Sequence, residues 1–176
     1  MKQIAILVFA LFFIPQINYA QAKNGFFNTT EEYLDDTVQK TGFDRTKIII
    51  EDFTNNDEFT NDIISNNLFT FYGVAYNDKL ISAATLENKS CWGQFLELCK
   101  NVKEGDSDVN NRKIVDIPYL KNIKFDKSKK TVIFLYLSTL NKRNVKKHIK
   151  PILVEVQKDP SFDYIVLLLD YNRVIN

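Results

Sequence analysis

The pattern of apolar and polar residues along the chain predicts alternating helices and strands. Apolar residues spaced three or four positions apart predict four helices, over residues 31–41, 56–66, 92–102 and 145–156. Apolar runs rich in β-branched and aromatic residues predict five strands, over residues 47–53, 69–76, 80–86, 131–137 and 164–169. This order predicts an α/β fold, in which a mixed sheet of about five strands is flanked by about four helices.

Short local signals mark the ends of several of these elements. Thr29 and Glu32 have the spacing of a capping box, and Gly42 follows as a helix stop, so the first helix is bounded at both ends. The segment Asn77-Asp78-Lys79 separates two apolar runs, and Asn and Asp tolerate the left-handed backbone that a tight hairpin needs. The run Ile48-Ile49-Ile50 suits a strand covered on both faces.

The last helix is expected to continue through a proline. Val145, Ile149, Ile152 and Val156 form one apolar stripe that passes Pro151. Proline has no N–H to donate, so a kink that costs up to about 3 kcal/mol in an isolated helix must be tolerated by packing.

The segment Lys150-Pro151-Ile152-Leu153-Val154-Glu155-Val156, which follows the strand 131–137, resembles the active-site helix of thioredoxins. In that family a kinking proline is followed by Ile-Leu-x-Glu-aliphatic, five residues after the second cysteine of Cys-x-x-Cys. Counting back places Arg143 and Lys146 at the two cysteine positions. The resemblance therefore implies a thioredoxin-like fold without dithiol chemistry.

The order of segments differs from that of thioredoxin. The strand and helix that carry the resemblance come after the predicted hairpin, so the chain is either a permuted relative or a coincidental match. The cis-proline that begins the family's hairpin has no counterpart between Asn61 and Ile117. The resemblance therefore does not extend to the family's substrate-facing loop.

The N-terminus has the three parts of a secretory signal. Met1-Lys2 supplies charge, Ile4 to Ile14 is apolar, and Ala20-Gln21-Ala22 is a small-x-small cleavage site. The apolar run is shorter than the roughly 20 residues that a helix needs to cross a bilayer. We interpret residues 1–22 as a signal peptide and residues 23–176 as one exported domain, periplasmic or extracellular, with no membrane span in the mature chain.

Charge is nearly balanced overall but unevenly distributed. Lys and Arg number 23 against 22 Asp and Glu, so total charge implies no polyanionic partner. Residues 31–62 carry ten acids against three bases, whereas residues 121–150 carry ten bases against one acid. These regions are either two solvated faces that attract each other weakly or a means of steering a charged partner.

A basic cluster stands at the start of the last helix, opposite its apolar stripe. It comprises Lys142, Arg143, Lys146, Lys147 and Lys150. Cations at a helix start oppose the helix dipole, whereas free N–H groups there attract anions. The cluster predicts weak binding of a small anion at Arg143, Lys146 and Lys147, with a solvated basic face as the alternative.

Cys91 and Cys99 are the only cysteines, and cysteines of exported chains usually pair. On a continuous helix their Cα atoms would lie about 12 Å apart, beyond the roughly 7 Å limit for a disulfide. A bridge therefore requires the helix to start late or to break near Gly93. Otherwise Cys99 is a core thiol, and Cys91 is a candidate reactive thiol in the first helical turn.

Other catalytic and cofactor patterns are absent from the sequence. The single histidine, His148, has no neighbouring relay partner, and there is no Gly-rich phosphate loop, zinc spacing or G-x-S-x-G elbow. Aromatic and basic residues are not interleaved in the basic stretch, which disfavours nucleic acid as a partner. We therefore expect no metal or cofactor.

These observations favour a non-catalytic binding or accessory module whose partner is a protein or a small anion. One alternative is a thiol-dependent oxidoreductase that uses Cys91. The other is an inhibitor or immunity-type partner of a secreted protein.

The signal interpretation makes a direct prediction. We expect the mature protein from the native host to begin at Lys23, because cleavage follows Ala22. Amino-terminal sequencing of the protein recovered from periplasm or culture medium measures this. An intracellular pool that retains Met1 as the main species would contradict it.

Overall fold

The computed structural model describes residues 26–51, 53, 56–65, 68–83, 90–104 and 111–174. The predicted signal peptide, residues 1–22, lies outside the described residues. The described strands form one mixed sheet in the order β1-β6-β5-β2-β3-β4. The strands are β1 (Ile48–Ile49), β2 (Phe71–Tyr76), β3 (Lys79–Ser82), β4 (Asn111–Lys113), β5 (Lys130–Tyr136) and β6 (Phe162–Leu168). The predicted α/β class, a mixed sheet flanked by helices, is confirmed.

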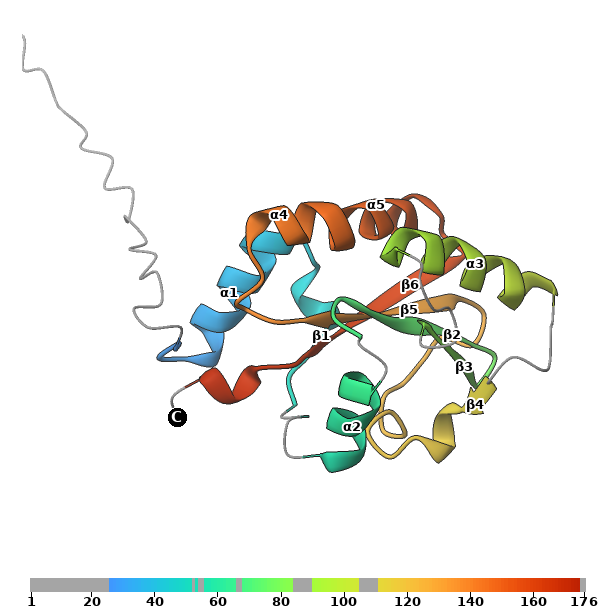
Figure 1. Cartoon of the computed structure of the whole chain (residues 1–176), viewed down its shortest axis with the longest axis horizontal. Helices are drawn as coiled ribbons and strands as arrows, with labels where there is room; N and C mark the ends of the chain where they lie inside the picture. The colour runs from blue at the N-terminus through green and yellow to red at the C-terminus, as the bar shows by residue number, and fades with distance from the viewer. Residues whose placement is uncertain are drawn as a thin grey trace, which may run out of the picture.

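Helices cover both faces of this sheet (Figure 1). The helices are α1 (Thr30–Thr41), α2 (Asp57–Ser65), α3 (Cys91–Glu104), α4 (Lys142–Asn144) and α5 (Lys150–Lys158). Helices α3, α4 and α5 lie along one face, and α2 lies on the other with the turns that follow β4. Helix α1 lies at one end of the molecule, beside α4.

The centre of the sheet is a parallel pair joined by the last helix. Strands β5 and β6 pair in parallel from Lys130↔Phe162 to Tyr136↔Leu168, and every residue of β5 is buried. On its other side β5 pairs with β2, which runs antiparallel and continues into the hairpin with β3. The apolar runs at 69–76, 131–137 and 164–169 therefore correspond to strands with neighbours on both sides.

The predicted ends of α1 and the predicted hairpin turn are confirmed. The Thr29 side chain accepts a hydrogen bond from the Glu32 N–H at 3.1 Å, and Gly42 ends α1 with a positive φ of 81°. Asn77 and Asp78 have φ angles of 49° and 62°, as the two central residues of a tight hairpin turn require.

The helix does continue past Pro151, through a π-helical turn over Val145–Ile149. Within this turn the Lys150 N–H donates to the Val145 carbonyl, five residues back. The extra residue widens the helix just before Pro151, which has no N–H to donate. The helix can therefore continue past the proline. The predicted stripe is also confirmed, because Val145, Ile149, Ile152 and Val156 are all buried.

The first predicted strand is shorter and less covered than expected. The prediction was a strand over 47–53 with both faces covered, but β1 contains only Ile48 and Ile49. It is the edge strand of the sheet and pairs only with β6, so Ile50 is 48% exposed. Conversely, β4 lies in a segment for which no strand is predicted, because a three-residue edge strand leaves almost no periodic signal.

The buried face of α3 is rotated from the predicted one. The apolar stripe expected on this helix comprised Trp92, Phe95, Leu96, Cys99 and Val102. Phe95 is buried as expected, yet Leu96 is 50% exposed and Cys99 is half-buried. Leu98, outside the expected stripe, is buried, because the helix packs against both β2 and α5. Periodicity identified the helix but not which apolar residues its neighbours would cover.

The hairpin contains a close backbone approach at Gly73. A Cβ atom at this position would lie 2.2 Å from the Ile81 carbonyl oxygen on β3. We expect Gly73→Ala to lower the free energy of unfolding by about 2–3 kcal/mol, because β2 and β3 must separate to admit the methyl group. Urea unfolding followed by circular dichroism measures the loss.

Gly42→Ala is the matched control for this prediction. A Cβ at Gly42 meets no atom within 4 Å, so only its positive φ opposes the substitution, at a cost of about 1 kcal/mol. If Gly73→Ala lowers the free energy of unfolding no more than Gly42→Ala does, the close approach of the backbone at Gly73 does not destabilise the variant.

Candidate functional site

The carboxyl ends of the parallel strands β5 and β6 meet at one edge of the sheet, where ligand sites of α/β proteins commonly form. Ser138 follows β5 at this edge and Asp170 follows β6, and both are buried. The Asp170 carboxylate accepts from the Ser138 N–H at 3.0 and 3.1 Å and from the Ser138 hydroxyl at 2.7 Å. Asp170 therefore sets the position of the turn from which the basic helix starts.

Helix α1 is bound to the same carboxylate. The Tyr33 hydroxyl donates to Asp170 Oδ1 at 2.6 Å, and Lys40 Nζ donates to the Ser138 carbonyl at 3.1 Å. Burial, the Asp170 charge and this hydrogen bond raise the pKa of Tyr33 far above its ordinary value. Tyr33 therefore stays neutral and acts as a hydrogen-bond donor that holds α1 to the sheet.

A side-chain cap begins the basic helix. Asn141 Oδ1 accepts from the Asn144 N–H at 2.9 Å, and the Asn141 carbonyl accepts from the Val145 N–H at 3.1 Å. Anion binding was predicted partly from free N–H groups at this helix end, but the cap already uses one of them. Attraction for an anion must therefore come mainly from the side-chain cations.

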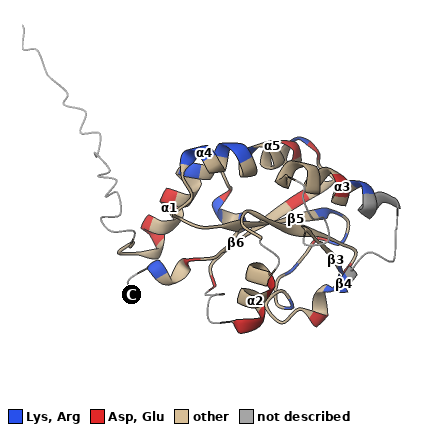
Figure 2. Cartoon of the chain, viewed as in Figure 1, with Lys and Arg blue, Asp and Glu red and all other residues tan. Residues whose placement is uncertain are grey.

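The five basic residues lie together on one exposed face, as predicted (Figure 2). We call this face the basic helix face; it comprises Lys142, Arg143, Lys146, Lys147 and Lys150. Within the described part of the chain, no ion pair joins any of them to a carboxylate. His148 is half-buried on the flank of the π-helical turn.

The acids of the N-terminal region do not neutralise this face. Asp35 pairs with Arg45 at 2.7 Å, and Glu31 pairs with the same guanidinium. Asp36 pairs with Lys40 at 2.7 Å within α1. These three carboxylates of α1 are thus paired with nearby bases. They do not compensate the charge of the basic helix face.

Cys91 lies at the same edge of the sheet. It is the first residue of α3, and its Sγ is 3.3 Å from the Thr70 Oγ1, just before β2. The Thr70 carbonyl in turn accepts from the Leu135 N–H near the end of β5. Fold topology therefore brings the Cys91 thiol and Ser138 to the same edge of the sheet. The two residues are 47 positions apart in the sequence, and no motif connects them.

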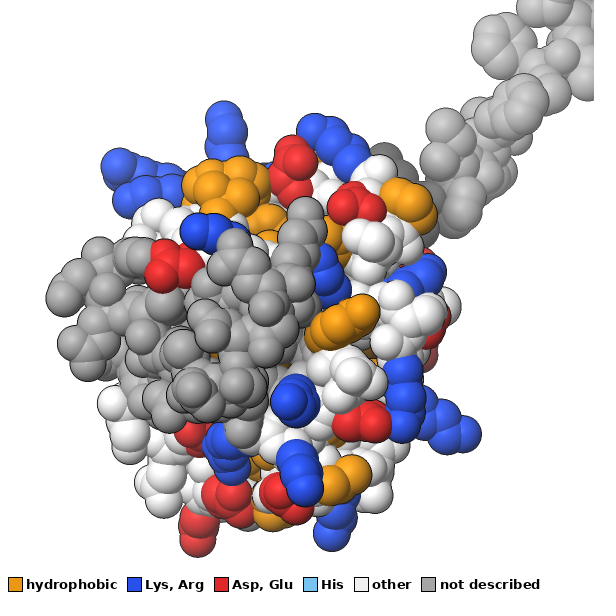
Figure 3. All heavy atoms as spheres, turned by 90° about the vertical axis from the view of Figure 1, so that its right-hand side faces the viewer, with side chains coloured by type: hydrophobic (Ala, Val, Ile, Leu, Met, Phe, Trp, Pro, Cys, Tyr) orange, Lys and Arg blue, Asp and Glu red, His pale blue; other side chains and the backbone are white. Residues whose placement is uncertain are grey.

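No disulfide joins Cys91 and Cys99. Helix α3 begins at Cys91 and runs unbroken to Glu104, so it neither starts late nor breaks near Gly93, as a bridge would require. Cys99 is not in the closed core; it lines an open groove beside α3. At the level of the helix layer, Figure 3 shows an apolar patch flanked by basic and acidic side chains.

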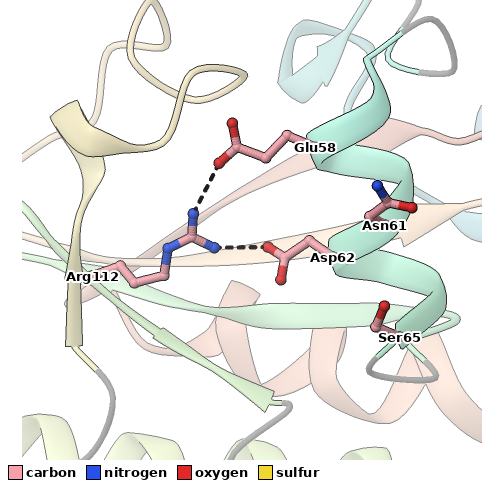
Figure 4. A pocket seen from close by; sticks show the side chains of 5 residues that line it. All are labelled: Glu58, Asn61, Asp62, Ser65 and Arg112. Atoms are coloured by element: carbon pink, nitrogen blue, oxygen red, sulfur yellow. Dashed lines mark hydrogen bonds and ion pairs between the residues drawn. The ribbon is translucent and has the colours of Figure 1, made fainter.

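A polar pocket of about 540 Å³ lies on the opposite face of the sheet (Figure 4). Its lining residues are Glu58, Asn61, Asp62, Ser65 and Arg112. Arg112 reaches from β4 to α2, where it pairs with Asp62 at 2.9 Å and with Glu58 at 3.3 Å. The spacing of Glu58 and Asp62 shows that they share a helix face, but nothing in the sequence identified Arg112 as their partner.

Two buried tyrosines bind Asp62, one of the residues that line this pocket. The Tyr72 and Tyr119 hydroxyls donate to Asp62 Oδ2 at 2.5 and 2.6 Å. Burial raises the pKa of Tyr72 well above its ordinary value, and the contacts with Tyr119 and Asp62 raise it further. Burial and the hydrogen bond to Asp62 likewise raise the pKa of Tyr119. Both hydroxyls therefore stay neutral near neutral pH and act as hydrogen-bond donors, and through Asp62 the Tyr72 hydroxyl joins α2 to the sheet.

Two further searches of the described residues bear on function. No cluster of three or more His, Cys, Asp or Glu side chains has metal-binding geometry in the described ranges. Among the described helices, none combines the length and hydrophobicity needed to span a bilayer.

Comparison with protein-family models, with curated proteins and with solved structures finds no match to this chain.

Proposed function

We propose that this chain is an exported, non-catalytic binding or accessory protein with a thioredoxin-like fold. Two features support the fold: the parallel unit β5–α5–β6, and the antiparallel hairpin strand β2 beside β5. The proline-containing helix segment at 150–156 follows the central strand, as in the family it resembles. Arg143 and Lys146 occupy the positions of the family's cysteines, which is why the proposed role is binding.

The observation that carries the proposal is the basic helix face. Five exposed cations share one side of a single helical unit, and the described residues contain no carboxylate paired with them. Like charges near a helix start repel one another and oppose the helix dipole, so the isolated arrangement is unfavourable. An anionic group from a partner would relieve both effects.

The chemistry of this face fits a phosphate, sulfate or carboxylate group, either free or carried by a protein. Because all five side chains are exposed, each contact is screened by water and salt. Binding of an isolated small anion should therefore be weak, and a partner with several negative charges should bind more tightly.

We expect phosphate or sulfate to bind the basic helix face with a dissociation constant on the order of millimolar. Amide chemical shifts of residues 141–150, followed by NMR during titration, measure this binding. Arg143→Ala and Lys146→Ala should each weaken it, and added sodium chloride should weaken it in all variants, since the contacts are electrostatic.

Lys124→Ala is the matched control, because Lys124 is an exposed lysine in the segment that covers the other face of the sheet. It should leave the titration unchanged. The proposal is wrong if the chemical shift changes at 141–150 are no larger than those around Lys124 and do not respond to Arg143→Ala and Lys146→Ala. The basic helix face would then be solvated surface charge only. A polyanion such as heparin, titrated in parallel, distinguishes a multivalent partner from a single anion.

A second candidate function rests on Cys91. Its thiol lies in the first turn of α3, against the Thr70 hydroxyl and at the sheet edge where the basic helix starts. A thiol-dependent oxidoreductase would use such a position. Turnover of disulfides also needs a second thiol to resolve the mixed disulfide, and Cys99 lies two turns further along the same helix.

We therefore expect no reduction of insulin disulfides by this protein in the presence of dithiothreitol above the rate of the reductant alone. Turbidity of the released B chain measures the reaction. Turnover that disappears in Cys91→Ser would favour the oxidoreductase over the binding protein.

A further inference from the structure

The outward side of the last helix carries positive charge along most of its length. Helix α4, the π-helical turn and α5 form one continuous helix from Lys142 to Lys158. Lys158 adds a sixth cation to the five of the basic helix face, and the single acid in this range, Glu155, is paired with Lys158 at 3.0 Å. At about 1.5 Å per residue, these cations extend over roughly 25 Å. A partner that meets all of them must present negative charge over a comparable length.

The chemistry of these cations favours a diffuse negative surface over one enclosed anion. Arg143 is the only arginine of the basic helix face, and the other four residues are lysines. A guanidinium is a rigid fork that suits a single phosphate or carboxylate, whereas a lysine ammonium is a flexible point charge. Neither the polar pocket beside Arg112 nor the groove beside α3 is lined by any of the five. Their negative partner therefore contacts them on the open surface.

Exposed apolar side chains accompany the cations on the same helix layer. Val154 is 45% exposed and lies one turn after Lys150 on α5. Across from it, Leu96 of α3 is 50% exposed and lines the groove between α3 and α5 together with Glu155. The aromatic residues of this groove are Trp92, Phe95 and Phe162. Lysines beside exposed aliphatic residues and a tryptophan are the composition of surfaces that bind at the boundary between lipid headgroups and acyl chains.

We propose that the basic helix face, together with Val154, Leu96 and Trp92, binds the surface of a lipid bilayer that contains anionic lipids. This inference rests on the proposed anion binding and names the partner of that face. The lysine ammonium groups contact lipid phosphates, and each contact adds to the attraction, so that weak individual contacts sum. The apolar side chains reach the acyl boundary. A soluble polyanion would meet the cations only and would leave Val154 and Leu96 in water.

Sedimentation of the protein with vesicles measures this binding. The vesicles consist of phosphatidylcholine alone or contain about one third phosphatidylglycerol, and we expect binding to the anionic vesicles to be at least about tenfold tighter. The neutral vesicles measure the contribution of apolar residues elsewhere in the chain. Sodium chloride should weaken binding to the anionic vesicles, since salt screens the lysines. Trp92, the only tryptophan of the chain, should emit at shorter wavelength when lipid replaces water at the groove.

Substitutions test the two parts of the surface separately. Lys147→Gln should lower the affinity for anionic vesicles about fivefold, the loss expected for one lysine near an anionic surface. Lys124→Gln is its control, because Lys124 is an exposed lysine on the other face of the sheet. Leu96→Gln and Val154→Thr should each lower vesicle affinity about twofold or more and leave heparin affinity unchanged. Val115→Thr, at a valine that is 67% exposed in the turn after β4, is the control for Val154→Thr and should change neither.

The outcomes distinguish this inference from the proposed anion binding. Vesicle binding that is no tighter with phosphatidylglycerol, or that is insensitive to both Leu96→Gln and Val154→Thr, would overturn the bilayer as the partner. Binding of heparin without binding of anionic vesicles would do the same, and it would leave the proposed anion binding intact. If phosphate, heparin and anionic vesicles all fail to bind, the proposed function fails together with this inference.

Discussion

A buried carboxylate, Asp170, is the interaction on which the arrangement of this molecule depends. It stands where β6 ends, and its oxygens accept from both the backbone and the hydroxyl of Ser138, where β5 ends. Tyr33 adds a third element by donating from α1. A charge can be buried at this depth only with such partners, so the carboxylate requires the two central strands and α1 to be in these positions.

The basic helix face follows from this constraint. Once Ser138 is held, the chain turns through Asn141 into the helix, and the π-helical turn carries it past Pro151. The buried side of that helix is apolar, so its cations must all point to water. Their grouping results from the position of the helix on the sheet, and the lack of carboxylate partners is what makes it a candidate surface.

The basic helix face and the groove between α3 and α5 lie on the same helix layer but differ in character. The basic helix face is wholly exposed and charged, so its interactions are long-ranged, weak and sensitive to salt. The groove is partly enclosed and aromatic, so contact area contributes more there than charge.

Interactions within a few residues could be read from the sequence. The hairpin turn at Asn77-Asp78 depends on the backbone tolerance of those two residues, and the ends of α1 depend on Thr29 and Gly42. The helix stripe through Pro151 was equally visible, because its burial follows a regular period. Exposure of the basic helix face followed from that stripe, and it is the part of the candidate site that the sequence predicted.

Tertiary structure alone decided everything that depends on partners distant in the chain. The edge position of β1, the side of α3 that is buried and the pairing of Arg112 with Asp62 all result from which strands and helices become neighbours. The approach of Cys91 to the end of β5 and the aromatic groove have the same origin. Local propensity extends over one or two turns, whereas these contacts are formed by packing between elements tens of residues apart, which no local pattern encodes.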